Sequence, residues 1–201
     1  MIRILLAEDQ GMMRSALALL LNLEPDLEVV AQVATGTEVI DAARDSAADI
    51  ALLDIEMPGM SGLDAAVALR TAVPACRVLI LTTFGRPGYL RRAMEAGAGG
   101  FLVKDGPVEE LADAIRRVLA GEKVVDPTLA AAALSAGPNP LTERERDVLT
   151  AAVDGSTIAD IAGRLYLSES TVRNYLSSAI GKTRTRNRIE AIGAARANGW
   201  L

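Results

Sequence analysis

Several short apolar runs in this sequence end at residues that can bind a metal ion or a phosphoryl group. These residues supply three carboxylates, one hydroxyl and one ammonium group, and they are Glu8, Asp9, Asp54, Thr82 and Lys104. Carboxylates that crowd together repel one another unless a cation neutralises them, and hard oxygen ligands favour Mg²⁺ (or Mn²⁺). A carboxylate beside such an ion can attack phosphorus and become an aspartyl phosphate. The residue types therefore predict phosphoryl chemistry, provided that the chain brings them together.

Each of these residues has a predicted role. Asp54 is the predicted nucleophile, because it ends a central strand and a turn-forming Pro-Gly pair leaves its face open. Asp9 and Asp54 are predicted metal ligands, with Glu8 acting through a water molecule. Lys104 would neutralise the developing phosphoryl charge, and Thr82 would donate a hydrogen bond to it. Any one of these residues, taken alone, is better explained as an ordinary solvent-facing residue at the end of a strand. All five at successive strand ends favour a site for a metal ion and a phosphoryl group.

The elements that must position these residues alternate regularly over the first 120 residues. We predict strands near 2–7, 28–33, 50–54, 77–82 and 100–104, and helices near 11–22, 36–46, 62–71, 87–96 and 107–120. Parallel strands joined by helical crossovers bring their carboxyl ends to one edge of a sheet, where such sheets bind ligands. The pattern predicts an α/β fold, a (βα)5 doubly wound parallel sheet of the flavodoxin-like type, over residues 1–121.

The chain changes character after this predicted domain. The alanine-rich run 130–133 allows a short helix, and Pro138 and Pro140 then break it, because a residue before proline avoids the helical region. We therefore predict a linker over residues 122–140. The remaining residues, 141–201, read as a separate small domain.

The last 61 positions read as four short helices. Thr142 begins a capping box that opens the first of them, and Thr157 with Asp160 could cap the second. Ser168 caps a third helix that runs to about Lys182. Two short helices joined by a tight turn, the second with exposed polar residues, predict a small all-α helix-turn-helix domain that binds double-stranded DNA.

Composition excludes several classes of functional site. The chain contains no histidine, which excludes a Ser-His-Asp triad, a histidine metal ligand and an internal phosphohistidine. The formal charge of −5 divides unevenly: residues 1–126 carry 12 cations and 19 anions, a net of −7, and residues 127–201 carry 9 and 7, a net of +2. The single cysteine, Cys76, is predicted to be a buried apolar residue. No apolar run reaches the ~18 residues of a membrane span, and we expect a cytoplasmic protein without a membrane partner.

These motifs resemble two known protein families. The first half is similar to the receiver domains of two-component response regulators, through the segments LLAEDQ, LLDIEMPGMSGLDA, LTTF and AGAGGFLVKD. The second half resembles the helix-turn-helix of the NarL/FixJ (LuxR-type) class. Segments such as DIEMPG and LTTFGRPGYL look closer still to a membrane-fluidity regulator within this family, which implies lipid-desaturation genes as targets.

The resemblance implies roles for the matching residues. Asp54 would be the phosphoacceptor, Glu8 and Asp9 the acidic pair, and Glu56 the source of a backbone carbonyl for Mg²⁺. The implied switch pair is Thr82 with Phe101, and Lys104 would contact the phosphoryl group. The implied donor is a sensor histidine kinase, so the chain would be a phosphoacceptor and not an enzyme. Asp105 follows Lys104 where many receivers place a cis proline, which leaves the geometry of that peptide bond open.

The resemblance also assigns DNA contacts. The positions that match major-groove residues are Thr171, Arg173, Asn174 and Ser177. Lys182 and Arg184, at the end of the same helix, are better placed for phosphates. By helical spacing, Val172, Leu176 and Ile180 are predicted to be core.

The apolar residues of the first predicted helix indicate that the chain forms a homodimer. Its apolar residues wrap too far round for a helix that only covers a sheet, which usually marks an interface. We expect a homodimer on phosphorylation through the first and fifth helices, with Met12, Ala16, Leu19, Leu23, Leu111 and Ile115 at the contact.

Two other functions stay open at this point. An aspartyl-phosphate phosphotransferase or phosphatase also uses an aspartate nucleophile on an α/β sheet, and Glu56 lies two residues after Asp54, where such enzymes place a general acid. The Pro-Gly turn and the lack of a cap insertion weigh against it. A phosphate-independent receiver-type binding module would not need the complete acidic set.

Overall fold

The structure, a computed structural model, describes residues 1–83, 87–135 and 139–201. The chain forms two compact units: of the described residues, 1–83 and 90–130 belong to the first, 87–89 and 131–201 belong to the second, and the main division falls after Ala130. This division falls inside the segment 122–140 that the sequence predicts as a linker; residues 136–138 of the predicted helix break lie outside the described residues. The outer limits of the two predicted domains stay a prediction.

The first unit is built on a parallel sheet of six strands in the order β2-β1-β3-β4-β5-β6. The strands are β1 (Ile2–Ala7), β2 (Leu27–Val33), β3 (Ile50–Leu53), β4 (Arg77–Thr82), β5 (Gly100–Val103) and β6 (Val124–Val125). The first five confirm the predicted strands to within one residue at each end. The sequence missed β6, because two residues are too few to show strand periodicity.

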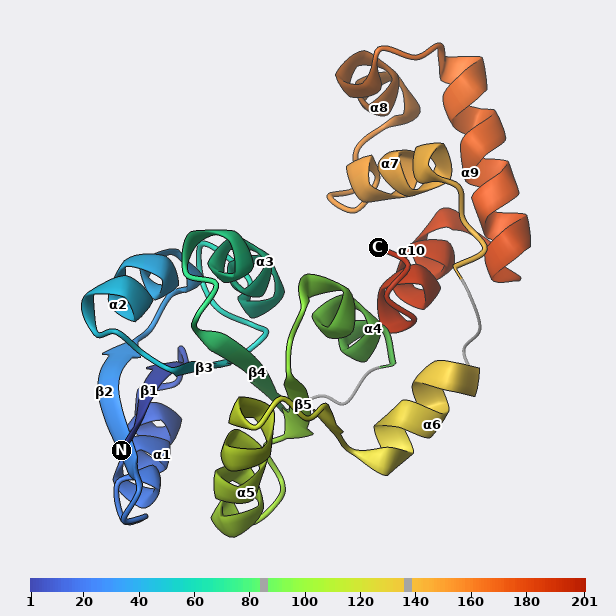
Figure 1. Ribbon diagram of the computed structural model, residues 1–201. Coiled ribbons are helices and arrows are strands. Elements are labelled where there is room, and N and C mark those ends of the chain that lie inside the picture. The colour runs from blue at the N-terminus through green and yellow to red at the C-terminus, as the bar shows by residue number, and fades with distance from the viewer. Residues whose placement is uncertain (84–86, 136–138) are drawn as a thin grey trace. The chain divides into compact units, whose positions relative to one another are not determined.

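Helices cover both faces of this sheet. They are α1 (Gly11–Leu21), α2 (Val39–Asp45), α3 (Gly62–Ala72), α4 (Pro87–Ala96) and α5 (Val108–Leu119). A further helix, α6 (Pro127–Ser135), follows β6 and runs across the division between the two units. Figure 1 shows α1 and α5 on one face, and α2 and α3 on the opposite face. The doubly wound α/β fold is therefore confirmed. The helix predicted at 36–46 differs, because a 3₁₀ turn (Gly36–Glu38) capped by Thr35 precedes α2.

The core of the first unit explains why the strands read as continuous apolar runs. All four residues of β3 are completely buried, since helices cover both sides of the central strands. One side of the core packs α1 and α5 against the sheet, and both Leu111 and Ile115 belong to it, at 6% and 0% exposed. The prediction that these two residues form a dimer surface is wrong, because their apolar stripe is already used to cover the sheet.

Residues 139–201 of the second unit form four helices. They are α7 (Glu143–Ala151), α8 (Ile158–Leu165), α9 (Glu169–Thr183) and α10 (Arg188–Ala197). The predicted caps are confirmed: the side chains of Thr142, Thr157 and Ser168 each accept a hydrogen bond from the backbone N–H three residues later. Val172 and Leu176 are buried in the core of this unit, as predicted from their spacing.

Ile180, the third predicted core residue of α9, is partly buried and packs against the same core. Along the described ranges, no helix combines the length and the apolar character needed to span a bilayer.

Candidate functional site

Backbone hydrogen bonds align the carboxyl ends of the strands. Asp54 directly follows β3, and its N–H donates to the carbonyl of Ala7 at the end of β1 (2.9 Å). Lys104 directly follows β5, and its N–H donates to the carbonyl of Thr82 at the end of β4 (2.8 Å). The strands thus end in register, and the residues that follow them meet at one edge of the sheet.

Three of the predicted residues form a buried charged cluster at this edge. The Nζ atom of Lys104 lies 3.0 Å from Oδ2 of Asp54 and also contacts the carboxylate of Glu8. The side chains of Lys104, Glu8 and Asp54 are 4%, 1% and 7% exposed. Because charges are seldom buried without partners, this arrangement is a built site and not a set of solvent-facing strand ends.

The electrostatics of Asp54 reflect two opposing effects. Burial raises the pKa of this carboxyl group, and the nearby Lys104 ammonium opposes that rise; the net shift is upward. The N–H of Ile55 donates to Oδ1 of Asp54 at 2.8 Å and fixes the orientation of the carboxylate. Oδ2 therefore faces Lys104.

The carboxylates at this edge fit a hard divalent cation. Oxygen atoms of Glu8, Asp9 and Asp54 lie within 4.8 Å of one another. Asp9 is exposed while the other two are buried, so a cation there could keep water molecules as Mg²⁺ prefers. The carboxylate of Glu8 is also paired directly with Lys104, and its role toward the metal through a water molecule stays a prediction.

Three supporting residues were not recognised in the sequence. Nη1 of Arg14, on α1, donates to the backbone carbonyl of Glu8 (2.5 Å), and the N–H of Gln10 donates to Oε1 of Glu8 (3.1 Å). Gly62 lets α3 begin against the site, because a Cβ there would lie 1.9 Å from the carbonyl oxygen of Asp54. Only the glycine could have been noticed, as the first residue of a predicted helix.

The remaining receiver predictions are placed but not tested. Phe101 is fully buried on β5, two residues before Val103, which pairs with Thr82 across the ladder. Glu56 is exposed in the loop after β3. The Lys104–Asp105 peptide bond is trans, as is every other peptide bond in the described segments.

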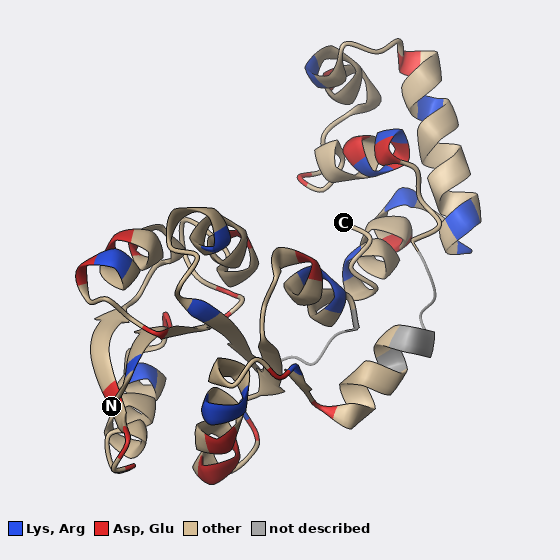
Figure 2. Cartoon of the chain, viewed as in Figure 1, with Lys and Arg blue, Asp and Glu red and all other residues tan. Residues whose placement is uncertain are grey.

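The second candidate surface is the solvent-facing side of α9. Arg173, Asn174 and Ser177 are exposed, and Thr171 is partly exposed. Figure 2 shows basic residues near both ends of this helix. Arg173 is paired with Glu169 one turn earlier at 2.8 Å, which is an exposed and therefore weak pair.

Lys182 has a structural partner as well as a predicted DNA role. Its Nζ atom lies 2.8 Å from the carboxylate of Glu145, a buried residue of α7 that also accepts a hydrogen bond from the hydroxyl of Ser178. Burial raises the pKa of Glu145, but hydrogen bonds from Lys182, Ser178 and Thr142 outweigh it and lower the pKa to about 2. Glu145 thus fixes α9 against α7. From the sequence, Glu145 was recognised only as part of the capping box of Thr142, and its pairing with Lys182 was not predicted.

Comparisons with known proteins agree with this geometry. Residues 4–116 match the family model of the response regulator receiver domain, and residues 139–195 match that of the bacterial regulatory proteins of the luxR family. The chain is a LuxR-type response regulator. It is 46% identical to the transcriptional regulatory protein DesR of Bacillus subtilis over 201 residues, which is 100% of both chains.

Other relatives show the same two-domain organisation. The regulator is also 46% identical to the uncharacterized transcriptional regulatory protein YvfU of B. subtilis, again over 100% of both chains. The crystal structure of the response regulator ChrA, from a heme-sensing two-component system, is similar with a TM-score of 0.60 at 32% identity, covering 100% of this chain and 98% of that one. The RcsB–DNA complex has a TM-score of 0.71 at 20% identity, which shows a shared fold.

Proposed function

We propose that this DNA-binding regulator is switched by transfer of a phosphoryl group to Asp54, with Mg²⁺ or Mn²⁺ held by Asp9, Asp54 and the backbone carbonyl of Glu56. The observation that carries the proposal is the buried contact between Lys104 and Asp54, whose charged atoms lie 3.0 Å apart. A strand-end lysine that served only solubility would extend into water. Burial of this ammonium group beside a carboxylate instead suits the recognition of an incoming anion.

The residues of the site would share the work of the transfer. Oδ2 of Asp54 attacks phosphorus, and the bond to the leaving group of the donor breaks as the new O–P bond forms. Lys104 lies beside that oxygen and would neutralise charge on the phosphoryl group, while the hydroxyl of Thr82 would donate to it. A bound divalent cation would supply further positive charge to the same oxygens. Phe101 would follow Thr82 as the second member of the switch.

The proposed donor is a sensor histidine kinase, because this chain has no histidine of its own. We propose a phosphoacceptor and not an enzyme. A phosphatase or phosphotransferase would need a general acid, and Glu56, the only acid at the required spacing, is exposed. A module that never uses phosphate would need the Lys104–Asp54 pair only for stability, and it would have no need for the carboxylate of Asp9 beside that pair.

Acetyl phosphate labelling with Mg²⁺, followed by intact-protein mass measurement, tests this function. We expect one phosphoryl group on the parent chain and none on Asp54→Asn. The matched control is Asp113→Asn, which removes an exposed carboxylate on α5 and should be labelled like the parent. Labelling of the Asp54 variant would contradict the assignment, and turnover of a small phosphate ester would favour the enzyme.

Phosphorylation is proposed to promote a homodimer that places two copies of α9 on paired half-sites. Exposed apolar side chains on α1 and just after it support this proposal: Met12 is 89% exposed, Leu19 is 66% exposed, and Leu23, two residues beyond the helix, is 73% exposed. Ala16 is exposed on the same helix. Since Leu111 and Ile115 are buried, the contribution of α5 would come from its exposed charged residues.

The target genes and the compartment are also proposals. Resemblance to DesR suggests lipid-desaturation genes, but YvfU is equally similar at 46% identity, so overall similarity does not choose the target. Sequencing the DNA recovered with the regulator before and after acetyl phosphate treatment would identify it. A chromosomal DNA partner would place the protein in the cytoplasm.

A further inference from the structure

Tyr166 has an unusual conformation in the turn of the helix-turn-helix. It is the residue that ends α8, and its backbone is left-handed, with φ 53° and ψ 44°. Its side chain is 95% exposed, although tyrosine is a large and mostly apolar residue. Glycine or asparagine is the usual residue at such a position, because a Cβ makes the left-handed conformation costly.

The fold of the second unit does not use this tyrosine ring. The turn is held by neighbouring groups, since the N–H groups of Tyr166 and Leu167 both bond to the carbonyl of Ala162. Leu167 packs against the core, whereas Tyr166 points away from it. The left-handed backbone of a non-glycine residue costs about 1–2 kcal/mol, and the exposed side chain of Tyr166 gains too little from packing to offset this cost. A backbone outlier of this kind, at a large side chain that the fold leaves exposed, favours a function for that side chain.

The surroundings of the turn are suited to a phosphate. In a helix-turn-helix the first helix crosses the DNA backbone and the second enters the major groove, so the turn between them passes the sugar-phosphate chain. Immediately after Tyr166, the start of α9 presents three hydroxyl groups: Ser168 Oγ lies 2.9 Å from Ser170 Oγ and 2.8 Å from Thr171 Oγ1. The beginning of a 15-residue helix also carries partial positive charge.

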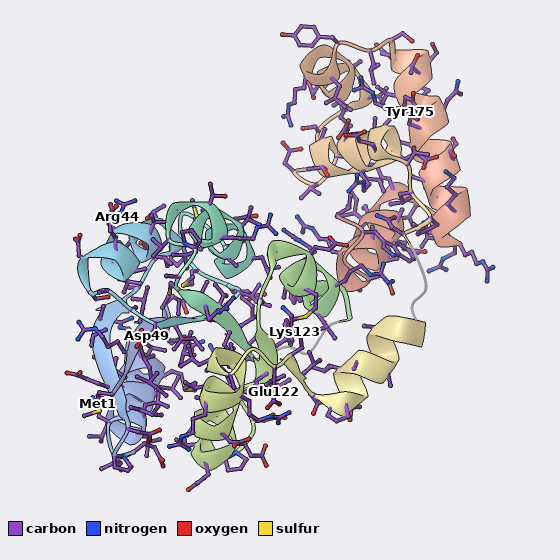
Figure 3. All side chains as sticks on the ribbon, in the orientation of Figure 1. Met1, Arg44, Asp49, Glu122, Lys123 and Tyr175 are labelled. Carbon is purple, nitrogen blue, oxygen red and sulfur yellow. The ribbon has the colours of Figure 1, made fainter. Side chains whose placement is uncertain are left out.

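We propose that the hydroxyl of Tyr166 donates a hydrogen bond to a DNA phosphate beside the major groove that α9 enters. This inference rests on the DNA-binding function of the chain and adds a contact outside α9. Because the phenol is neutral, it would strengthen binding to all sequences without releasing a counterion. Tyr175, labelled in Figure 3, lies on α9 itself and packs partly against the core.

Fluorescence anisotropy of the full chain with a labelled mixed-sequence duplex, at several salt concentrations, tests the contact. We expect Tyr166→Phe to bind roughly three- to tenfold more weakly than the parent, with an unchanged slope against salt. Tyr166→Gly should lose as much affinity while its thermal stability is equal or higher, because glycine removes the backbone cost. That combination separates a DNA contact from a structural role.

Arg184 provides the matched control. It also ends a helix in the left-handed conformation, with φ 55°, but it carries a charge. Arg184→Gly should weaken binding and also reduce the salt slope by about one ion. If Tyr166→Phe binds like the parent, the proposed hydrogen bond is wrong. If the parent itself binds no duplex at low salt, the DNA-binding function fails and the contact fails with it.

Discussion

At the scale of single residues, the site depends on one buried ammonium group. Lys104 lies between the carboxylates of Glu8 and Asp54, and its positive charge balances their negative charges. Removing one partner of a buried charge pair usually costs several kcal/mol, because the other charge stays buried. The lysine therefore serves the folded state before it serves any phosphoryl group.

We predict that Lys104→Ala lowers the melting temperature of the chain and makes it respond more strongly to Mg²⁺. Without the ammonium group, a divalent cation is the remaining means of neutralising the carboxylates, so added Mg²⁺ should recover more stability in the variant than in the parent. Differential scanning calorimetry with EDTA or Mg²⁺ measures this difference. An equal response of the two proteins would show that Lys104 does not neutralise the metal site.

The second residue-scale prediction concerns Glu145. Its pKa is lowered from its usual value of 4.5 to about 2 in the folded chain, so its ionised form stabilises the fold above pH 4.5 and that contribution disappears as the pH falls towards 2. Glu145→Gln should therefore be less stable than the parent at pH 7. We expect a loss of only about 1–2 kcal/mol, because Lys182 is one-third exposed and solvent weakens its attraction to Glu145.

Urea unfolding of the full chain at several pH values checks this prediction. The difference between Glu145→Gln and the parent should shrink below pH 4.5. Glu143→Gln, at an exposed position of the same helix, is the control and should follow the parent at every pH. A difference that is constant with pH would mean that packing, and not ionisation, explains the role of Glu145.

At the scale of elements, α9 packs into the core with one side and exposes its predicted DNA-contacting residues on the other. Val172 and Leu176 bury one side in the unit, and Arg173 and Asn174 expose the other. Arg173→Ala should weaken binding to the recovered target DNA by roughly 1–3 kcal/mol and relax the sequence preference. Competition between specific and mixed-sequence duplexes measures both effects.

The control for Arg173 uses its partner on the same helix. Glu169→Gln releases Arg173 from its exposed ion pair and removes a negative charge that faces DNA. This variant should bind at least as tightly as the parent. Equal losses on specific and mixed DNA for Arg173→Ala would show that Arg173 contacts phosphate and not a base.

The exposed apolar side of α1 carries the prediction about assembly. Leu19→Arg should shift the phosphorylated chain towards monomer in analytical ultracentrifugation, because a buried charge at an apolar contact is costly. Val67→Arg places the same charge on α3, at an exposed apolar position on the other face of the sheet, and should leave the dimer intact. Dimers of equal strength in both variants would exclude α1 as the contact.

At the scale of the whole molecule, phosphorylation and DNA binding should be coupled through assembly. A phosphorylated parent should bind a duplex with two half-sites more tightly than the unphosphorylated chain, because two linked contacts act together. Phosphorylated Leu19→Arg should lose this gain while binding a single half-site normally. Anisotropy titrations with one- and two-site duplexes distinguish the two cases.

Much of this architecture could be predicted from the sequence, because it depends on local patterns. The strands of the first unit are short continuous apolar runs, and the caps at Thr142 and Ser168 are visible as residue types at fixed spacing. Partners that are distant in sequence could not be read in the same way. Neither the pairing of Lys182 with Glu145 nor the burial of Leu111 follows from neighbouring residues. Both depend on which face of a helix meets another element.

The brevity of β6 has a consequence for unwanted self-association. An edge strand offers unpaired backbone groups that can recruit the edge of another sheet, and a long flat edge invites aggregation. In this chain β6 offers only Val124 and Val125, after which Pro127 begins α6. So short an edge gives a second copy little to pair with. Pairing of two copies through β6 is therefore disfavoured, and the longer edge strand β2 (Leu27–Val33), at the opposite side of the sheet, is the edge at which a second copy could add a strand.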